Sequence, residues 1–197
     1  MVVSMLICCL LAVEPEMPLV KSNESSQFDL VGISADTLAI KDGVISVSGK
    51  PNGYFATKSK FKNYRLKFDW RYDRPADLKS DAAFQGNSGL LIHIEGPDKI
   101  WPRCLEVQLM NADAGNTFAL GGKFEGKKNA TAQKKAIKAV GEWNSEVVEC
   151  KDGAVVCLIN GTEVCRGTGA VPNEGRIGWQ SEGSLIQLRN ITIQPLD

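Results

Sequence analysis

The sequence predicts an all-β protein, an antiparallel β-sandwich of two sheets with jelly-roll topology. Segments with strand character recur about every 8 to 12 residues, and tight-turn pairs such as Asp-Gly and Asn-Gly separate them. Helical segments do not alternate with these strands, which argues against a parallel α/β sheet. The chain has 197 residues, of which 43% are hydrophobic, so it is long enough to form one domain with its own hydrophobic core.

The charges of the chain balance. Lys and Arg together number 23, and so do Asp and Glu. Because there is no basic excess, we do not expect nucleic acid as a partner, and a small or neutral partner is favoured. No pattern in the sequence decides between a monomer and an oligomer.

The first 20 residues have the character of a leader for export. Residues 1–13 form an apolar run of the length found in signal peptides, too short to cross a bilayer. We therefore predict a signal peptide on an exported bacterial protein, whether periplasmic, secreted or lipid-anchored, and no stable membrane insertion. No Lys or Arg precedes the run, so a buried first strand is the alternative. Residues 21–27 are polar and predict a linker, followed by a single domain over residues 28–197.

Turn chemistry and alternation predict the first strands of that domain. Residues 38–48 predict a hairpin with its turn at Asp42-Gly43, because this pair readily adopts the positive φ angles of a two-residue turn. Residues 54–58 predict a short strand. Residues 64–72 alternate between apolar and polar side chains, which is the clearest strand signal in the chain.

Residues 86–111, which follow a polar loop, predict two strands that carry polar side chains. Gly86-Asn87-Ser88-Gly89 predicts a turn that leads into an apolar strand. In the second strand Glu106 and Gln108 share one face, and the apolar residues around them share the other. A polar face of this kind is either solvated or the floor of a binding site.

The second half of the chain continues the strand pattern with one interruption. Residues 112–128 are rich in glycine and predict a long irregular loop, a kind of segment that is often functional or mobile. Residues 130–139 have the composition of a short helix whose basic side chains face solvent. The remaining signals are turns at Asp152-Gly153 and Asn160-Gly161, which predict two consecutive hairpins, and final strands over residues 175–180 and 185–193.

Four cysteines follow the leader: Cys104, Cys150, Cys157 and Cys165. A two-residue turn in the first hairpin places Cys150 opposite Val155, and Cys157 lies one diagonal step away on the same face. The same register places Cys165 opposite Val156, on the other face. A Cys150–Cys157 disulfide is near the geometric limit, so we favour free buried thiols. None of the spacings resembles a zinc site.

Six short motifs along the chain occur together in one known family. They are Tyr64–Trp70, Asn87-Ser88-Gly89, Leu105-Glu106-Val107-Gln108, Gly141-Glu142-Trp143-Asn144, Leu158-Ile159-Asn160-Gly161, and Ile177 to Gly183 with Arg189-Asn190-Ile191. In this order they resemble the bacterial family of 3-keto-disaccharide hydrolases, over roughly residues 28–195. The resemblance implies a jelly roll of the concanavalin A-like lectin and glucanase superfamily, with carbohydrate bound on a concave face.

The chain departs from the common residues of that family at three positions. His93, its one histidine, stands where the family commonly has Arg. Glu182 stands where many members have His, and Asn111 stands where an aspartate often occurs. The candidate acids and bases of this chain are therefore Glu106, His93 and Glu182, and we predict these three as catalytic.

The predicted substrate-binding residues carry amides, a ring or a cation: Asn87, Gln108, Trp101, Asn111, Gln180 and Arg189. Side-chain amides can donate to and accept from sugar hydroxyls. Trp101 lies in a loop flanked by prolines, where an aromatic ring can stack on the apolar face of a sugar.

Structural alternatives accompany several of these assignments. Glu106 is also consistent with a solvated strand carboxylate, His93 with a core histidine, and Asn87 equally with a turn residue. Arg189 is slightly favoured as an ion-pair partner over a substrate anchor. Trp143 and Trp179 are consistent with stacking on sugar or with burial, and burial is favoured for Trp143.

The resemblance implies cleavage of 3-keto-disaccharides or 3-keto-glycosides, a reaction that needs one well-placed base and an electrophile or metal to hold the enolate oxygen. A 3-keto group acidifies the C2 hydrogen, so Glu106 as base would start an elimination that water addition completes. Ordinary retaining hydrolysis needs two carboxylates about 5 to 5.5 Å apart, and the strand of Glu106 supplies only one. A non-catalytic carbohydrate-binding module is the alternative from another class. No cofactor is predicted; a divalent metal would assist the elimination, but no ligand motif supports one.

Overall fold

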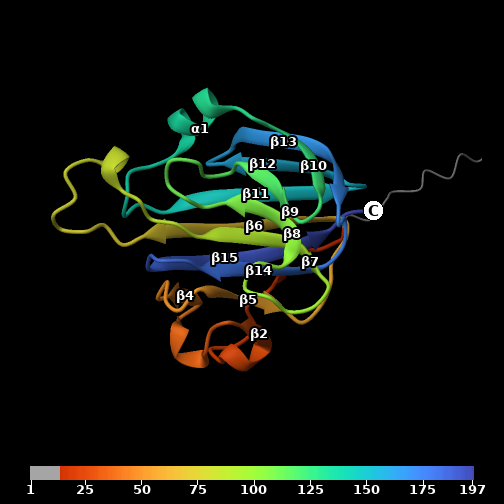
Figure 1. The fold of residues 1–197 in the computed structure, drawn as a ribbon, viewed down its shortest axis with the longest axis horizontal. Helices are drawn as coiled ribbons and strands as arrows, with labels where there is room; N and C mark the ends of the chain where they lie inside the picture. The colour runs from red at the N-terminus through yellow and green to blue at the C-terminus, as the bar shows by residue number, and fades with distance from the viewer. Residues whose placement is uncertain (1–13) are drawn as a thin grey trace, which may run out of the picture.

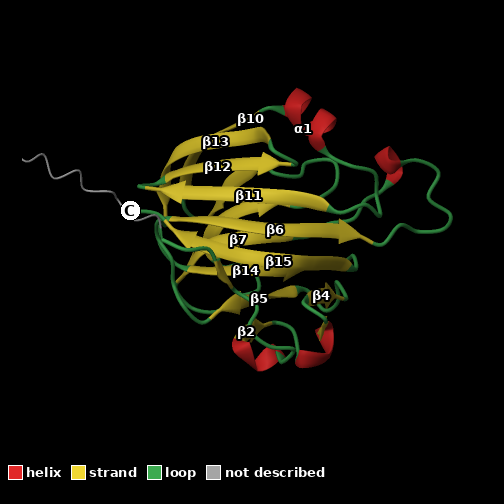
Figure 2. Cartoon of the chain, turned by 180° about the vertical axis from the view of Figure 1, so that it is seen from behind, coloured by secondary structure: helices red, strands yellow, loops and turns green. Residues whose placement is uncertain are grey.

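A computed structural model describes residues 14–197 of the protein. Within these residues the chain forms two antiparallel β-sheets that pack face to face (Figures 1 and 2). The predicted all-β sandwich is therefore confirmed. The helix α1 and the loop between β6 and β7 lie at the end of the sandwich away from the C-terminus (Figure 1).

The first sheet, which we call the large sheet, has the order β10 (Lys123–Lys128), β13 (Thr162–Val171), β12 (Ala154–Ile159), β11 (Asn144–Lys151), β6 (Tyr64–Tyr72), β15 (Ile186–Pro195), β4 (Val44–Val47) and β3 (Leu38–Lys41), with β1 (Met17–Pro18) also paired to β15. The second, the small sheet, has the order β2 (Phe28–Val31), β5 (Gly53–Thr57), β14 (Arg176–Ser181), β7 (Gly89–Glu95), β8 (Arg103–Gln108) and β9 (Thr117–Leu120). The helical segments are α1 (Ala130–Ala136) and the 3₁₀ turns η1 (Ser25–Gln27), η2 (Ala35–Thr37) and η3 (Asp81–Ala83).

Alternate side chains of the strands fill the space between the sheets. Strand β6 shows this most clearly, because every second residue from Tyr64 to Tyr72 is buried and the residues between are partly exposed. From the small sheet, Phe55 and Trp179 stack on each other with ring centroids 5.5 Å apart. Phe68 of the large sheet meets Trp179 edge to face. Burial of these large rings supplies much of the hydrophobic stabilisation.

The predicted two-residue turns are confirmed. Asp42 and Gly43 join β3 to β4, and both have positive φ angles, of 50° and 76°. The same pattern occurs at residues 152–153 and at residues 160–161. These angles match the twist of a tight hairpin. The short predicted helix is also confirmed, as α1, and the Asn129 side chain caps it by accepting from the backbone N–H of Ala132 at 3.0 Å.

The prediction of an irregular loop over residues 112–128 is wrong, because this segment contains strands β9 and β10. Two of its glycines, Gly122 and Gly126, mark close approaches of backbone. A Cβ at Gly122 would lie 2.0 Å from the carbonyl oxygen of Val171, and one at Gly126 would lie 2.8 Å from that of Thr117. Glycine in a strand often marks such contacts, and composition alone does not distinguish them from a loop.

The cysteines follow the predicted register in part. Cys150 opposes Val155, as expected. Cys165 opposes Cys157 and not Val156, because the register of β12 on β13 shifts between Cys157 and Leu158. Such a bulge changes which side chains face each other. All four cysteines within residues 14–197 are buried free thiols.

The sandwich begins earlier in the chain than residue 28. Met17 and Pro18 pair with β15, and the Leu19 N–H donates to the carbonyl of Ile191 at 3.0 Å. Residues 1–13, the apolar part of the predicted leader, lie outside the described residues. From residue 14 onward, no helix is long and apolar enough to cross a membrane.

A fully buried carboxyl group lies between the two sheets. Glu146 on β11 has no exposed surface, and its Oε2 accepts a hydrogen bond of 2.7 Å from the Trp70 indole N–H. Its Oε1 accepts a contact of 3.5 Å from the Cys157 thiol. Burial raises the pKa of Glu146 to about 8, and these two hydrogen bonds oppose the rise only in part.

We expect Glu146 to make the protein less stable as pH rises. The folded pKa of about 8 lies above the ordinary value of 4.5, so its favourable contribution is complete below pH 4.5 and is lost as pH rises through 8. Between pH 5 and 8, urea unfolding should show the wild type losing up to about 1.4 kcal/mol more per pH unit than Glu146→Gln. Glu149→Gln, on the same strand but partly solvent-exposed, is the control. Equal pH dependence in wild type and Glu146→Gln would contradict this.

Candidate functional site

The candidate site lies on the outer face of the small sheet, the side that faces away from the large sheet. In β8 the neighbours Leu105 and Val107 point inward to the core, so Glu106 between them points outward. Glu106 is only 5% exposed. It opposes Leu91 on β7 and Phe118 on β9. A carboxylate is therefore held among buried apolar and amide side chains on the outer face of the small sheet.

Two glutamine side chains contact Glu106. Gln108 donates through Nε2 to Glu106 Oε1 at 3.2 Å, and Gln180 on β14 donates through Nε2 to Glu106 Oε2 at 3.5 Å. Gly89 on the intervening strand β7 makes this contact sterically feasible. A Cβ at position 89 would lie 2.2 Å from Gln180 Oε1 and 2.8 Å from Glu106 Oε1. The missing side chain thus allows two strands on either side of β7 to bring their polar groups together.

The environment of Glu106 suits proton transfer near neutral pH. Burial is the main cause that raises its pKa to about 7, and the negative charge of Glu182 adds to the rise. The hydrogen bond from Gln180 acts in the opposite direction. Burial also raises the pKa of Glu182. The two glutamates are thus near enough to interact, and a base with a pKa near the working pH is the effective kind.

Unpartnered polar atoms lie beside this pair. The Gln180 Oε1 and Asn87 Oδ1 atoms are buried and make no hydrogen bond within the described part of the chain. Asn87 forms a single bridge with Gly183, next to Glu182, and the neighbouring Ser88 hydroxyl donates to the Gln180 carbonyl at 2.9 Å. Buried polar atoms normally have partners, so these amides are available to a ligand.

The structure therefore brings together four of the predicted site residues around Glu106: Asn87, Gln108, Gln180 and Glu182. Asn111 lies just beyond β8, where its carbonyl accepts from Gln133 at 3.4 Å and where it lines a pocket of about 450 Å³ beside α1. Trp101 lies at the opposite end of β8, half exposed. These two residues flank the cluster rather than join it.

His93 does not join the cluster, because a bulge in β7 turns it away. Leu91 opposes Glu106, so strict alternation would place His93 on the same outer face. The register of β7 on β8 instead shifts between Ile92 and Glu95. His93 itself has a φ angle of 57°, in the left-handed region that few residues other than glycine adopt.

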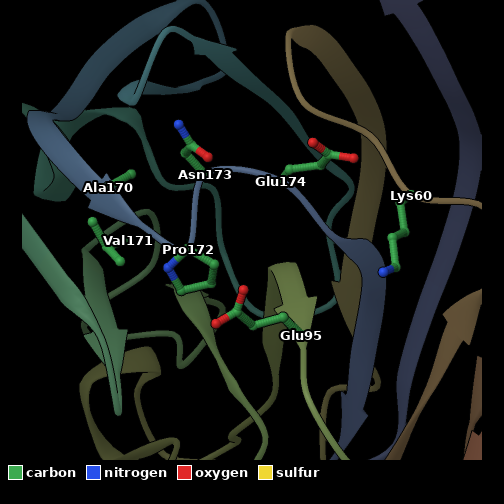
Figure 3. Close-up of a pocket in the computed structure, with 7 residues that line it drawn as sticks. All are labelled: Lys60, Glu95, Ala170, Val171, Pro172, Asn173 and Glu174. Atoms are coloured by element: carbon green, nitrogen blue, oxygen red, sulfur yellow. The ribbon is translucent and has the colours of Figure 1, made fainter.

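The His93 ring is buried at one end of the sandwich interior. It packs edge to face on Tyr64 with centroids 5.7 Å apart. Neither ring nitrogen has a partner of normal hydrogen-bond geometry among the described residues, and burial lowers its pKa to about 4. The backbone of Pro172 lies nearby. Figure 3 shows the pocket of about 490 Å³ at this end of the molecule, lined by Lys60, Glu95, Ala170, Val171, Pro172, Asn173 and Glu174.

Arg189 lies on the other side of the molecule, on the outer face of the large sheet. Its Nε donates to Asp69 Oδ2 at 3.2 Å, and its guanidinium lies 4.0 Å from the ring centre of Trp143. Arg189 is therefore an ion-pair partner of Asp69, the alternative that the sequence slightly favoured over a substrate anchor. Trp143 is partly exposed, whereas Trp179 is buried in the core. The preference for burial of Trp143 was thus wrong.

Sequence reasoning missed two features of the site. The first is the role of Gly89 as a gap, which depends on the order of β14, β7 and β8 in the sheet. The second is Phe118, which lies opposite Glu106 from the segment expected to be a loop. Strand-like alternation over residues 117–120 was the available signal. Within residues 14–197, no group of three or more His, Cys, Asp or Glu is placed to hold a metal ion.

Comparison with known proteins identifies the class and the family. The fold, the family match and the structural neighbours define a jelly-roll protein of the glycosyl hydrolase-like or carbohydrate-binding class. A family model described as the 3-keto-alpha-glucoside-1,2-lyase-like domain matches residues 20–194. The chain therefore belongs to that family, as its motifs predicted. A search of curated proteins found no match.

Solved structures share the fold at low sequence identity. A candidate glycosyl hydrolase from Parabacteroides distasonis is 20% identical with a TM-score of 0.68, over 92% of this chain and 100% of that one. A carbohydrate-binding module from Bacillus subtilis is 10% identical with a TM-score of 0.59, over 85% and 95%. A β-glucanase from Bacillus licheniformis is 9% identical with a TM-score of 0.54, over 95% and 100%. These likenesses confirm the jelly roll.

We expect Gly89→Ala to disrupt the site while the fold remains intact. The new methyl group meets only the ends of two flexible side chains, Gln180 and Glu106, so the free energy of unfolding should change by no more than about 1 kcal/mol. The displaced side chains should lower disaccharide affinity about tenfold, measured by calorimetry. Unchanged affinity in a stably folded variant would show that the contact across Gly89 does not matter for binding.

Proposed function

We propose that the protein cleaves 3-keto-glycosides, including 3-keto-disaccharides, by elimination followed by addition of water. The observation that carries this proposal is the buried Glu106 carboxylate on the outer face of the small sheet, whose pKa burial raises to about 7, beside the unpaired amide oxygens of Gln180 and Asn87. The description of the family as 1,2-lyase-like supports it, because a lyase breaks a bond by elimination.

The reaction begins with removal of a proton. The Glu106 carboxylate takes the hydrogen from C2, which the neighbouring C3 carbonyl acidifies, and the electron pair moves onto the C3 oxygen as an enolate. Return of that pair forms the C1–C2 double bond, restores the C3 carbonyl and expels the glycosidic oxygen. Water then adds at C1, and a proton returns to C2.

Neighbouring side chains have distinct roles in this scheme. The NH₂ groups of Gln108 and Gln180 each donate one hydrogen to Glu106, so the second hydrogen of each remains to stabilise the enolate oxygen as its charge develops. The unpaired amide oxygens of Gln180 and Asn87 would accept from sugar hydroxyls. Glu182, whose pKa burial also raises, supplies a proton to the leaving oxygen. This role for Glu182 differs from nucleophilic attack, so the strand of Glu106 needs no second carboxylate.

We expect cleavage of keto substrates and not of their parents. Wild-type protein should release free sugar from 3-keto-disaccharides, with no release from the unoxidised disaccharides. Glu106→Gln should reduce the rate by at least about a hundredfold, because it removes the base while keeping the shape of the side chain. Glu142→Gln, an exposed glutamate, is the control and should be fully active.

Other outcomes identify the alternatives. Cleavage of unoxidised disaccharides would indicate ordinary hydrolysis with two carboxylates. Binding of sugar without cleavage of either substrate would indicate a carbohydrate-binding module, a class to which one of the structural neighbours belongs. Either result would overturn the elimination.

We expect the rate to increase with pH toward neutrality. Glu106 must be ionised and Glu182 must carry the proton for the leaving oxygen, so kcat/KM should rise about tenfold per pH unit below pH 7 and fall again at higher pH. The charge of Glu182 raises the pKa of Glu106, so Glu182→Gln should move the rising limb to lower pH, whatever its effect on the maximal rate. If the rise in kcat/KM has the same pH midpoint in Glu182→Gln as in the wild type, the coupling of the two glutamates is contradicted.

A further inference from the structure

A further hollow lies at the end of β8 opposite to Gln108. Its volume is about 580 Å³, and its lining residues come from the β7–β8 loop and from β9: Glu95, Gly96, Pro97, Lys99, Trp101, Pro102, Arg103, Leu120 and Gly121. Trp101 is 50% exposed and is the most exposed of the four tryptophans. An exposed large aromatic side chain beside a hollow commonly marks a binding site.

Strand register connects this hollow to Glu106. Glu106 opposes Phe118 on β9, and two residues away on the same face Cys104 opposes Leu120. Leu120 packs on the outward cluster that contains Cys104 and also lines the hollow. From Arg103 to Glu106 the strand advances about 10 Å. A substrate of two sugar rings can extend over this distance, whereas a single ring cannot.

The wall of the hollow is held in place without a ligand. Arg103 forms an ion pair with Glu95, and its Nε donates to the carbonyl of Gly121 at 2.9 Å. Asp98 in the same loop pairs with Arg176 of β14. Glu95 points toward Pro172 in the neighbouring pocket (Figure 3). Because these contacts hold the β7–β8 loop in place, binding of a ligand does not carry the free-energy cost of ordering that loop.

We propose that this hollow binds the leaving group of the substrate as a pyranose ring stacked on Trp101. This inference rests on the proposed function, with the keto sugar over Glu106. The flat indole and the nearby proline rings suit the apolar face of a sugar, and the backbone and Lys99 at the rim suit its hydroxyls. The protein would then prefer disaccharides to 3-keto-glycosides with a small leaving group.

The test compares two substrates that differ only in the leaving group. A 3-keto-disaccharide and the methyl 3-keto-glycoside share the keto sugar, and only the first reaches the hollow. Trp101→Ala should lower kcat/KM for the disaccharide about tenfold and leave the methyl glycoside unchanged. Trp101→Phe should restore most of the loss. Ile100→Ala is the matched control, because Ile100 is similarly exposed in the same loop but does not line the hollow.

Disaccharide binding, measured by calorimetry on the same variants, separates this inference from the proposed function. If the wild type cleaves keto substrates and Trp101→Ala affects both of them equally, the inference is overturned and the proposed function stands. If the wild type cleaves nothing but Trp101→Ala alone weakens disaccharide binding, the hollow is a sugar site and the proposed reaction is wrong. Equal disaccharide affinity in all variants would overturn the hollow as a sugar site.

Discussion

The packing of two sheets against each other is the constraint on which the rest of this structure depends. Each strand has two faces, and only one of them can contact the other sheet. The inward faces carry the large rings, such as Trp70 and Trp179. The outward face of the small sheet carries a second apolar cluster together with the polar groups of the site, and Glu106 lies there because Leu105 and Val107 lie inside. The alternation of inward and outward side chains along each strand therefore determines both the core and the position of the site.

The alternation of side chains along single strands was also the part of the structure that could be predicted from the sequence. The strand over residues 64–72, the Asp-Gly and Asn-Gly hairpins, and the shared face of Glu106 and Gln108 all depend on local rules, and all are found in the structure. Asn87, Gln180 and Glu182 were predicted as separate site residues, and their meeting beside Glu106 was not predicted. It could not come from local rules, because these residues meet only through the order of strands in the small sheet.

The errors of prediction occur where alternation is interrupted. A bulge in β7 moves His93 into the interior, and a bulge between β12 and β13 moves Cys165 to face Cys157. A single extra residue reverses the faces of all that follow. The wrong prediction of a loop over residues 112–128 has another cause, the glycines of that segment. Gly122 and Gly126 allow strands to approach closely, and the same composition is typical of a loop.

Three glutamates with raised pKa values show what a buried carboxyl group needs in order to act on a substrate. Glu146 has no exposed surface and lies between the two sheets, bound by Trp70 and Cys157 of the core, so no substrate can reach it. Glu182 is only partly buried. Glu106 is nearly as buried as Glu146, but it lies on the outer face, and its amide neighbour Gln180 keeps an oxygen without a partner. A raised pKa alone does not identify a catalytic base; the position of Glu106 on the outer face of the small sheet, beside the unpaired amide oxygens of Gln180 and Asn87, distinguishes it from Glu146 between the sheets.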